Sequence, residues 1–114
     1  MALSIASRAV DGVTVLDLSG RITLGEGSVQ LRDAIRDLIS KGQKSILLNM
    51  GEVNYIDSSG LGELVSAYTT AKNQGAGLKL LSLTKKVKDV LQLTKLYTVF
   101  DIYDDEASAI GSYK

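Results

Sequence analysis

Residues 53–65 read Val-Asn-Tyr-Ile-Asp-Ser-Ser-Gly-Leu-Gly-Glu-Leu-Val, and this segment joins two apolar patterns of different kinds. The run Ile46-Leu47-Leu48 before it shows no alternation of polar and apolar residues, which is typical of a strand covered on both faces. The apolar residues that follow it recur at helical spacing; they are Leu61, Leu64, Val65, Tyr68 and Ala71. The segment therefore predicts the junction between a buried strand and a helix.

The rest of the chain continues this alternation. Asp11-Gly12 favours a two-residue hairpin turn between strands over 3–10 and 13–18. The patterns further predict a helix over 28–40 capped by Ser28, strands over 44–49 and 78–83, a helix after Thr84, a short strand over 99–103 and a last helix opened by Asp104, Asp105 and Glu106. Strands that alternate with helices need crossover connections. We expect one α/β domain over residues 1–114, with a mixed, mostly parallel sheet of four to five strands, an N-terminal antiparallel hairpin and about four helices.

Composition narrows the classes of function. The chain has 13 basic and 13 acidic residues, whereas a protein that binds nucleic acid usually carries a basic excess. It has no Cys and no His, which excludes thiol nucleophiles, imidazole bases and Cys/His zinc sites. We therefore expect a protein that is not an enzyme and that needs no cofactor, metal or nucleic acid.

The apolar runs are only a few residues long, far short of a membrane span. The first residues lack the basic start and long apolar stretch of a signal peptide. The sequence thus predicts a soluble, cytoplasmic protein with no membrane part, and we expect a monomer.

Asp57, Ser58 and Ser59 stand at the predicted mouth of a helix. Serine suits a helix N-cap, and the partial positive charge of a helix N-terminus favours a phosphate group. Phosphorylation there would add a charge of about −1.5 to −2. Gly60 and Gly62 lack side chains and would let another protein approach the first helical turn. The segment indicates a switch, although Asp-Ser-Ser-Gly is also an ordinary turn and cap composition.

Part of the chain resembles the signature of the STAS family, the anti-sigma factor antagonists of bacteria. The residues that carry this resemblance are Asn49, Val53, the run Tyr55-Ile56-Asp57-Ser58-Ser59-Gly60-Leu61-Gly62 and Leu64. The resemblance extends over nearly the whole chain. It implies that an anti-sigma factor serine kinase phosphorylates Ser58, the hydroxyl directly after the aspartate. It also implies that the dephosphorylated protein binds the anti-sigma factor and frees the sigma factor, and that a PP2C-type phosphatase restores this form.

The same resemblance implies roles for the neighbouring residues. Asp57 would orient the acceptor hydroxyl or contact the partner, and the docking surface would include Ser59, Gly60, Leu61 and Gly62. The chain departs from the family within Arg21-Ile22-Thr23-Leu24, where members often carry an aspartate. Thr23 stands near that position, and we place it among the partner-binding residues.

The same residues also bear on other functions. Similar domains serve as subunits of lipid-transport ABC complexes, where the serine would be structural, and others form part of membrane sulfate transporters. A hydrolase nucleophile at Ser58 would need a glycine in place of Ile56 and a histidine base. Gly25-Glu26-Gly27-Ser28 lacks the lysine of a P-loop and the third glycine of a dinucleotide site. The cluster Lys85, Lys86 and Lys88 reads as a solvated helix face, with contact to an acidic partner as the alternative.

Overall fold

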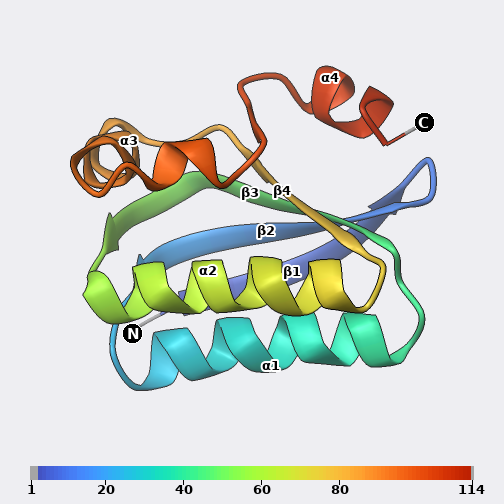
Figure 1. Ribbon diagram of the computed structural model, residues 1–114, viewed down its shortest axis with the longest axis horizontal. Helices are drawn as coiled ribbons and strands as arrows, with labels where there is room; N and C mark the ends of the chain where they lie inside the picture. The colour runs from blue at the N-terminus through green and yellow to red at the C-terminus, as the bar shows by residue number, and fades with distance from the viewer. Residues whose placement is uncertain (1–2, 114) are drawn as a thin grey trace.

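The computed structural model describes residues 3–113, which form one mixed β-sheet with helices against it (Figure 1). Its five strands are β1 (Leu3–Val10), β2 (Val13–Ile22), β3 (Ser45–Ile56), β4 (Gly77–Leu81) and β5 (Ile102–Tyr103), in the spatial order β1-β2-β3-β4-β5. β1 pairs antiparallel with β2, and every later pair is parallel. The predicted α/β class, with its N-terminal hairpin, is confirmed.

Four α-helices and one 3-10 turn accompany these strands within residues 3–113. They are α1 (Glu26–Ser40), α2 (Ser58–Asn73), α3 (Lys85–Leu93), the turn Leu96–Thr98 and α4 (Glu106–Gly111). α1 and α2 lie side by side on one face of the sheet, and both begin at the same end of the molecule (Figure 1). α3 lies near that end, and α4 covers the opposite face toward the other end (Figure 1). No helix in the described range combines the length and the apolar character that crossing a membrane requires.

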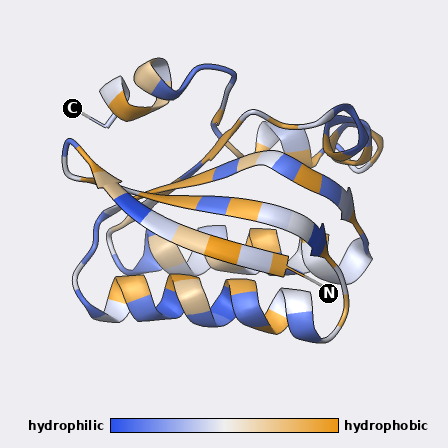
Figure 2. Ribbon diagram, turned by 180° about the vertical axis from the view of Figure 1, so that it is seen from behind, coloured by the Kyte–Doolittle hydropathy of each residue, from blue (hydrophilic) through white to orange (hydrophobic). Residues whose placement is uncertain are grey.

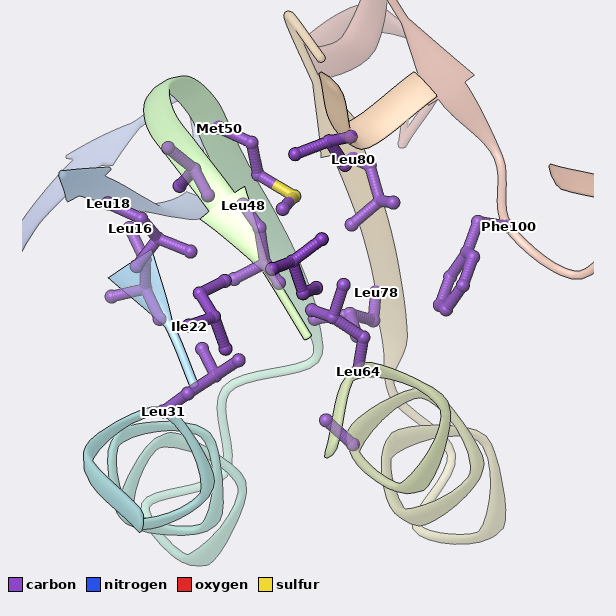
Figure 3. Packing of buried hydrophobic residues seen from close by; sticks show 14 of the residues in the cluster. Leu16, Leu18, Ile22, Leu31, Leu48, Met50, Leu64, Leu78, Leu80 and Phe100 are labelled. Atoms are coloured by element: carbon purple, nitrogen blue, oxygen red, sulfur yellow. The ribbon is translucent and has the colours of Figure 1, made fainter. Parts of the chain in front are cut away.

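The main core fills the space between the sheet and the helix pair. Leu16 and Leu48 point from the strands toward Leu31 of α1 and Leu64 of α2 (Figure 3), and all four side chains are almost fully buried. Hydrophobic and hydrophilic positions alternate along α1 (Figure 2), as the predicted amphipathic pattern requires. Each large apolar side chain buried in this core contributes about 1.5–3 kcal/mol to the free energy of folding when it leaves water. This core holds the start of α2 against the sheet.

A smaller core lies under α4. Its buried members are Val13, Val15, Leu47, Leu81, Ala109 and Ile110. The hydroxyl of Tyr113 donates a hydrogen bond of 2.6 Å to the backbone oxygen of Ile46, at the beginning of β3. The C-terminal helix is therefore fixed to the end of the sheet opposite to the start of α2.

Several predicted boundaries are wrong. β2 reaches Ile22 and β3 reaches Ile56, beyond the expected limits, because the two strands keep pairing past two register shifts. α1 begins at Glu26, so Ser28 lies inside the first turn, where its hydroxyl donates to the Thr23 backbone oxygen instead of capping the helix. Thr84 does precede α3, but its hydroxyl donates to the Val53 backbone oxygen. The strand expected over 99–103 is only the pair 102–103, because a 3-10 turn comes just before it.

Arg8 connects the hairpin to α4. Its guanidinium donates to Asp17 at 2.7 Å and to Glu106 at 3.0 Å, and Asn49 of β3 donates to the other Asp17 oxygen at 2.8 Å. The hydrogen bonds from Arg8 are the first cause that lowers the pKa of both carboxyl groups below their ordinary values of 3.8 and 4.5. This network ties three distant parts of the chain together over the far face of the sheet.

We expect Arg8→Gln to lower the free energy of unfolding at pH 7 by about 1 kcal/mol, because the ion pairs are partly exposed to water. A carboxyl group whose pKa is lowered in the folded state stabilises the fold at pH values above its pKa in the unfolded chain. This contribution is lost as the pH falls through the pKa of the folded state. The difference between Arg8→Gln and the parent protein should therefore vanish below about pH 2. Urea unfolding at several pH values measures it, with Arg36→Gln on exposed α1 as the control. A difference that persists in acid would contradict this account.

Candidate functional site

The candidate site lies where β2 and β3 end. Ile22 pairs with Ile56 in the sheet, and the next residue, Asp57, donates its backbone N–H to the Ile22 oxygen at 3.3 Å. The connection that leads to α1 therefore runs beside the first turn of α2. Parallel strands place their carboxyl ends at one edge of a sheet, where ligand and partner sites of α/β folds commonly form.

The carboxylate of Asp57 fixes this edge. One oxygen accepts the backbone N–H of Gly60 at 2.8 Å, and the other accepts the backbone N–H of Leu24 at 3.0 Å. Asp57 is thus the N-cap of α2, which corrects the expectation of a serine cap and makes Ser58 the first helical residue. The N–H groups of Gly60 and then Leu24 lower the pKa of Asp57 below its ordinary value of 3.8. The carboxylate therefore stays ionised at neutral pH.

Ser58 is exposed, and its side chain makes no hydrogen bond within the described residues. It occupies the first position of α2, where backbone N–H groups have no partner in the helix. Ser59 is half-buried and Gly62 is exposed, with nothing within 4 Å of the place where a side chain would begin. A modifying enzyme can reach the Ser58 hydroxyl without unfolding the domain.

Gly60 and Leu61 lie inside the domain. A Cβ atom on Gly60 would stand 2.1 Å from the Ile22 backbone oxygen, and Leu61 belongs to the main core with 7% of its surface exposed. The interpretation that Gly60 leaves room for a partner is wrong, because the missing side chain lets α2 approach β2. Among the two glycines, only Gly62 has open space beside it.

The loop before α1 completes the edge. Thr23 is half-buried, and its backbone oxygen accepts hydrogen bonds from both the N–H and the hydroxyl of Ser28. Leu24, held by Asp57, exposes 78% of its surface next to the start of α2. Leu24 could be assigned from the sequence only to the loop, because a single apolar loop residue carries no recognisable pattern. The contact with Asp57 is what assigns it to the site.

The site has the composition of a binding surface. In the described part of the chain, no group of three or more His, Cys, Asp or Glu side chains could hold a metal ion. Asp57 is committed to two backbone donors. What the arrangement offers is an accessible hydroxyl on a rigid, hydrogen-bonded edge.

Substituting the two glycines separately should give opposite results. Gly60→Ala forces its methyl group against the Ile22 backbone, so we expect the free energy of unfolding to fall by about 2 kcal/mol or more. Gly62→Ala meets no neighbour and should raise it by about 0.5–1 kcal/mol, since alanine favours a helix. Urea unfolding of both variants tests the pair. Equal effects would mean that α2 does not approach β2 as described.

Asp57→Asn should affect the two hydrogen bonds of the Asp57 carboxylate differently. The amide oxygen of asparagine can still cap α2 at Gly60, whereas its NH2 group would face the donor N–H of Leu24. Amide hydrogen exchange should therefore accelerate at Leu24 by a larger factor than at Gly60. NMR exchange rates of the variant and the parent measure this, and equal acceleration at both amides would contradict the double role of Asp57.

Comparisons with known proteins agree with this geometry. The family model described as "STAS domain" matches residues 4–109. The anti-sigma F factor antagonist of Paenibacillus polymyxa is 27% identical over 111 residues, which cover 96% of this chain and 94% of that protein. The anti-sigma-B factor antagonist of Bacillus subtilis is 30% identical over 87 residues, covering 76% of this chain and 78% of that protein.

A solved structure shows the same arrangement of strands and helices. The crystal structure of the Thermotoga maritima protein TM1081 superposes with a TM-score of 0.87 at 28% identity, over 95% of this chain and 92% of that one. The sequence and the fold of this chain thus both match those of known proteins over nearly the full length of the described residues. The chain belongs to the STAS domain family, among relatives that are anti-sigma factor antagonists.

Proposed function

We propose that this protein is an anti-sigma factor antagonist whose binding to an anti-sigma factor is switched off by phosphorylation of Ser58. The observation that carries the proposal is the exposed Ser58 hydroxyl, without a side-chain partner, on an edge that Asp57 holds rigid. The relatives named as anti-sigma factor antagonists support the class of partner. Ser59, Gly62 and Thr23 belong to the same edge and extend the proposed docking surface, while buried Gly60 and Leu61 place the helix beneath it.

The chemistry of the switch is a phosphoryl transfer. The partner kinase moves the terminal phosphoryl group of ATP to the Ser58 oxygen, the hydroxyl proton leaves to a base of the kinase, and ADP is released. A PP2C-type phosphatase reverses the change by hydrolysis, which returns the hydroxyl and releases inorganic phosphate. Neither step needs a catalytic group from this chain.

The effect of the phosphate is electrostatic and steric. It adds a charge of about −1.5 to −2 at a position where Asp57 already carries a negative charge. The free helix N–H groups can solvate this charge in the isolated protein. In a docked complex the same group would be buried without a matching cation, and that can cost several kcal/mol. About 1.4 kcal/mol already changes the dissociation constant tenfold.

The test uses the anti-sigma factor kinases encoded in the source organism, each purified and incubated with this protein and ATP. We expect intact-mass and peptide analysis to find one phosphate, located on Ser58. Ser58→Ala should bind the responsible kinase as the parent protein does, and Ser58→Asp should bind at least about tenfold more weakly. Calorimetry or surface binding measures both.

Ser66→Ala is the matched control, because it removes an exposed hydroxyl further along α2 and should leave both modification and binding nearly unchanged. Equal binding by Ser58→Ala and Ser58→Asp, or modification at another residue, would overturn the proposal. In that case a structural role of the serine, as in a transporter subunit, becomes the better explanation.

A further inference from the structure

A cleft of about 600 Å³ opens at the same end of the molecule as Ser58. It is lined by Arg21, Asn54, Tyr55, Thr84, Lys85 and Lys86. Arg21 and Tyr55 are paired residues of β2 and β3, directly before the Ile22–Ile56 pair that leads into Asp57. The lysines belong to the first turn of α3, the helix near this end in Figure 1. The cleft is thus continuous with the candidate site along the chain.

The lining is strongly and only positively charged. It holds three cations, and none of its residues in the described part of the chain is acidic. The Arg21 guanidinium lies 5.2 Å from the centre of the Tyr55 ring, which orients the guanidinium beside the cleft. Lys85 forms a 3.2 Å ion pair with Asp89, but 90% of its side chain stays exposed. Because the whole chain has no net charge, this is a local concentration of positive charge.

The start of α3 adds to the positive potential. Thr84 occupies the N-cap position, yet its hydroxyl donates to the Val53 backbone oxygen and caps no N–H group. The first N–H groups of α3 therefore have no side-chain acceptor. A helix N-terminus carries about half a positive charge, so the cleft favours negative groups beyond what its side chains supply.

From this juxtaposition we infer that the cleft docks an acidic segment of the protein partner, with carboxylates on Arg21 and Lys86. The inference rests on the proposed function only for the existence of that partner. A guanidinium binds a carboxylate through two parallel hydrogen bonds, and Asn54 and Tyr55 provide amide and aromatic contacts for the backbone of a peptide. The space is far larger than one small anion needs. Three cations are too few for the phosphate contacts that sustain nucleic-acid binding.

The test needs no identified partner. A hexaglutamate peptide is titrated into the isotopically labelled full chain at low salt, and backbone amide shifts are followed by NMR. We expect saturable shifts centred on Arg21, Tyr55 and Lys86. Physiological salt should weaken the binding, because it screens charge pairs that are exposed to water.

The variant Arg21→Gln/Lys86→Gln should weaken peptide binding about fivefold or more, as expected for losing two exposed charge contacts. The control Arg36→Gln/Lys72→Gln removes two cations from the helices α1 and α2 and should bind the peptide like the parent. The amide spectrum of each variant shows whether it keeps the fold.

Three results would overturn the inference: scattered shifts without saturation, equal losses in both double variants, or tripolyphosphate binding in the cleft tenfold more tightly than the peptide. The last result would indicate a site for small phosphate anions. None of them alters the expected behaviour of Ser58→Ala and Ser58→Asp, so failure of the cleft and failure of the switch can be told apart.

Discussion

The carboxylate of Asp57 is the constraint on which the functional edge depends. It accepts one backbone N–H from α2 and another from the loop before α1, so one side chain joins segments that are 33 residues apart. The hydroxyl of the next residue is thereby presented on a defined surface instead of on a loose turn. Ionisation is part of the arrangement, because two donors require an acceptor on each oxygen and a protonated carboxyl would supply only one good acceptor. The acid of the signature thus has a structural task that precedes any contact with a partner.

Asp57 can reach both donors only because α2 comes very close to β2. Gly60 allows α2 to lie against the Ile22 backbone, and the buried side chains of Leu61 and Leu64 pack the helix against the sheet. The main core fixes the position of α2, and Gly60 determines how closely the helix approaches β2. Asp57 then accepts the hydrogen bonds at the N-terminus of the helix. Residues of one short motif therefore divide between the interior and the surface, with Gly60 and Leu61 below and Ser58 and Gly62 outside.

Apolar periodicity predicted the order of the elements well, because that order depends on which residues leave water. The Asp11-Gly12 turn was also predicted correctly, since both residues adopt the positive φ that the hairpin requires. The end of β3 was missed because a polar residue such as Glu52, which pairs with Ser19, can extend a strand whose backbone has a neighbour to pair with. Ser28 was misread as a cap because its hydroxyl donates to the backbone oxygen of Thr23, a contact that composition does not reveal. The basic cleft was likewise hidden, as Arg21 and Lys86 meet only through the crossover of the sheet.

The hairpin also determines how the domain can be attached to anything else. β1 begins opposite Gly20, close to the edge that carries Asp57, whereas the Tyr113 hydroxyl is fixed to Ile46 at the far end of β3. A tether, fluorophore or fused module placed before Leu3 would emerge beside the proposed docking edge and crowd it. The same cargo placed after Tyr113 would emerge on the other side of the molecule and leave that edge clear. Immobilisation through the C-terminal side is accordingly the orientation in which a sensor built from this domain keeps the proposed docking edge facing the solution.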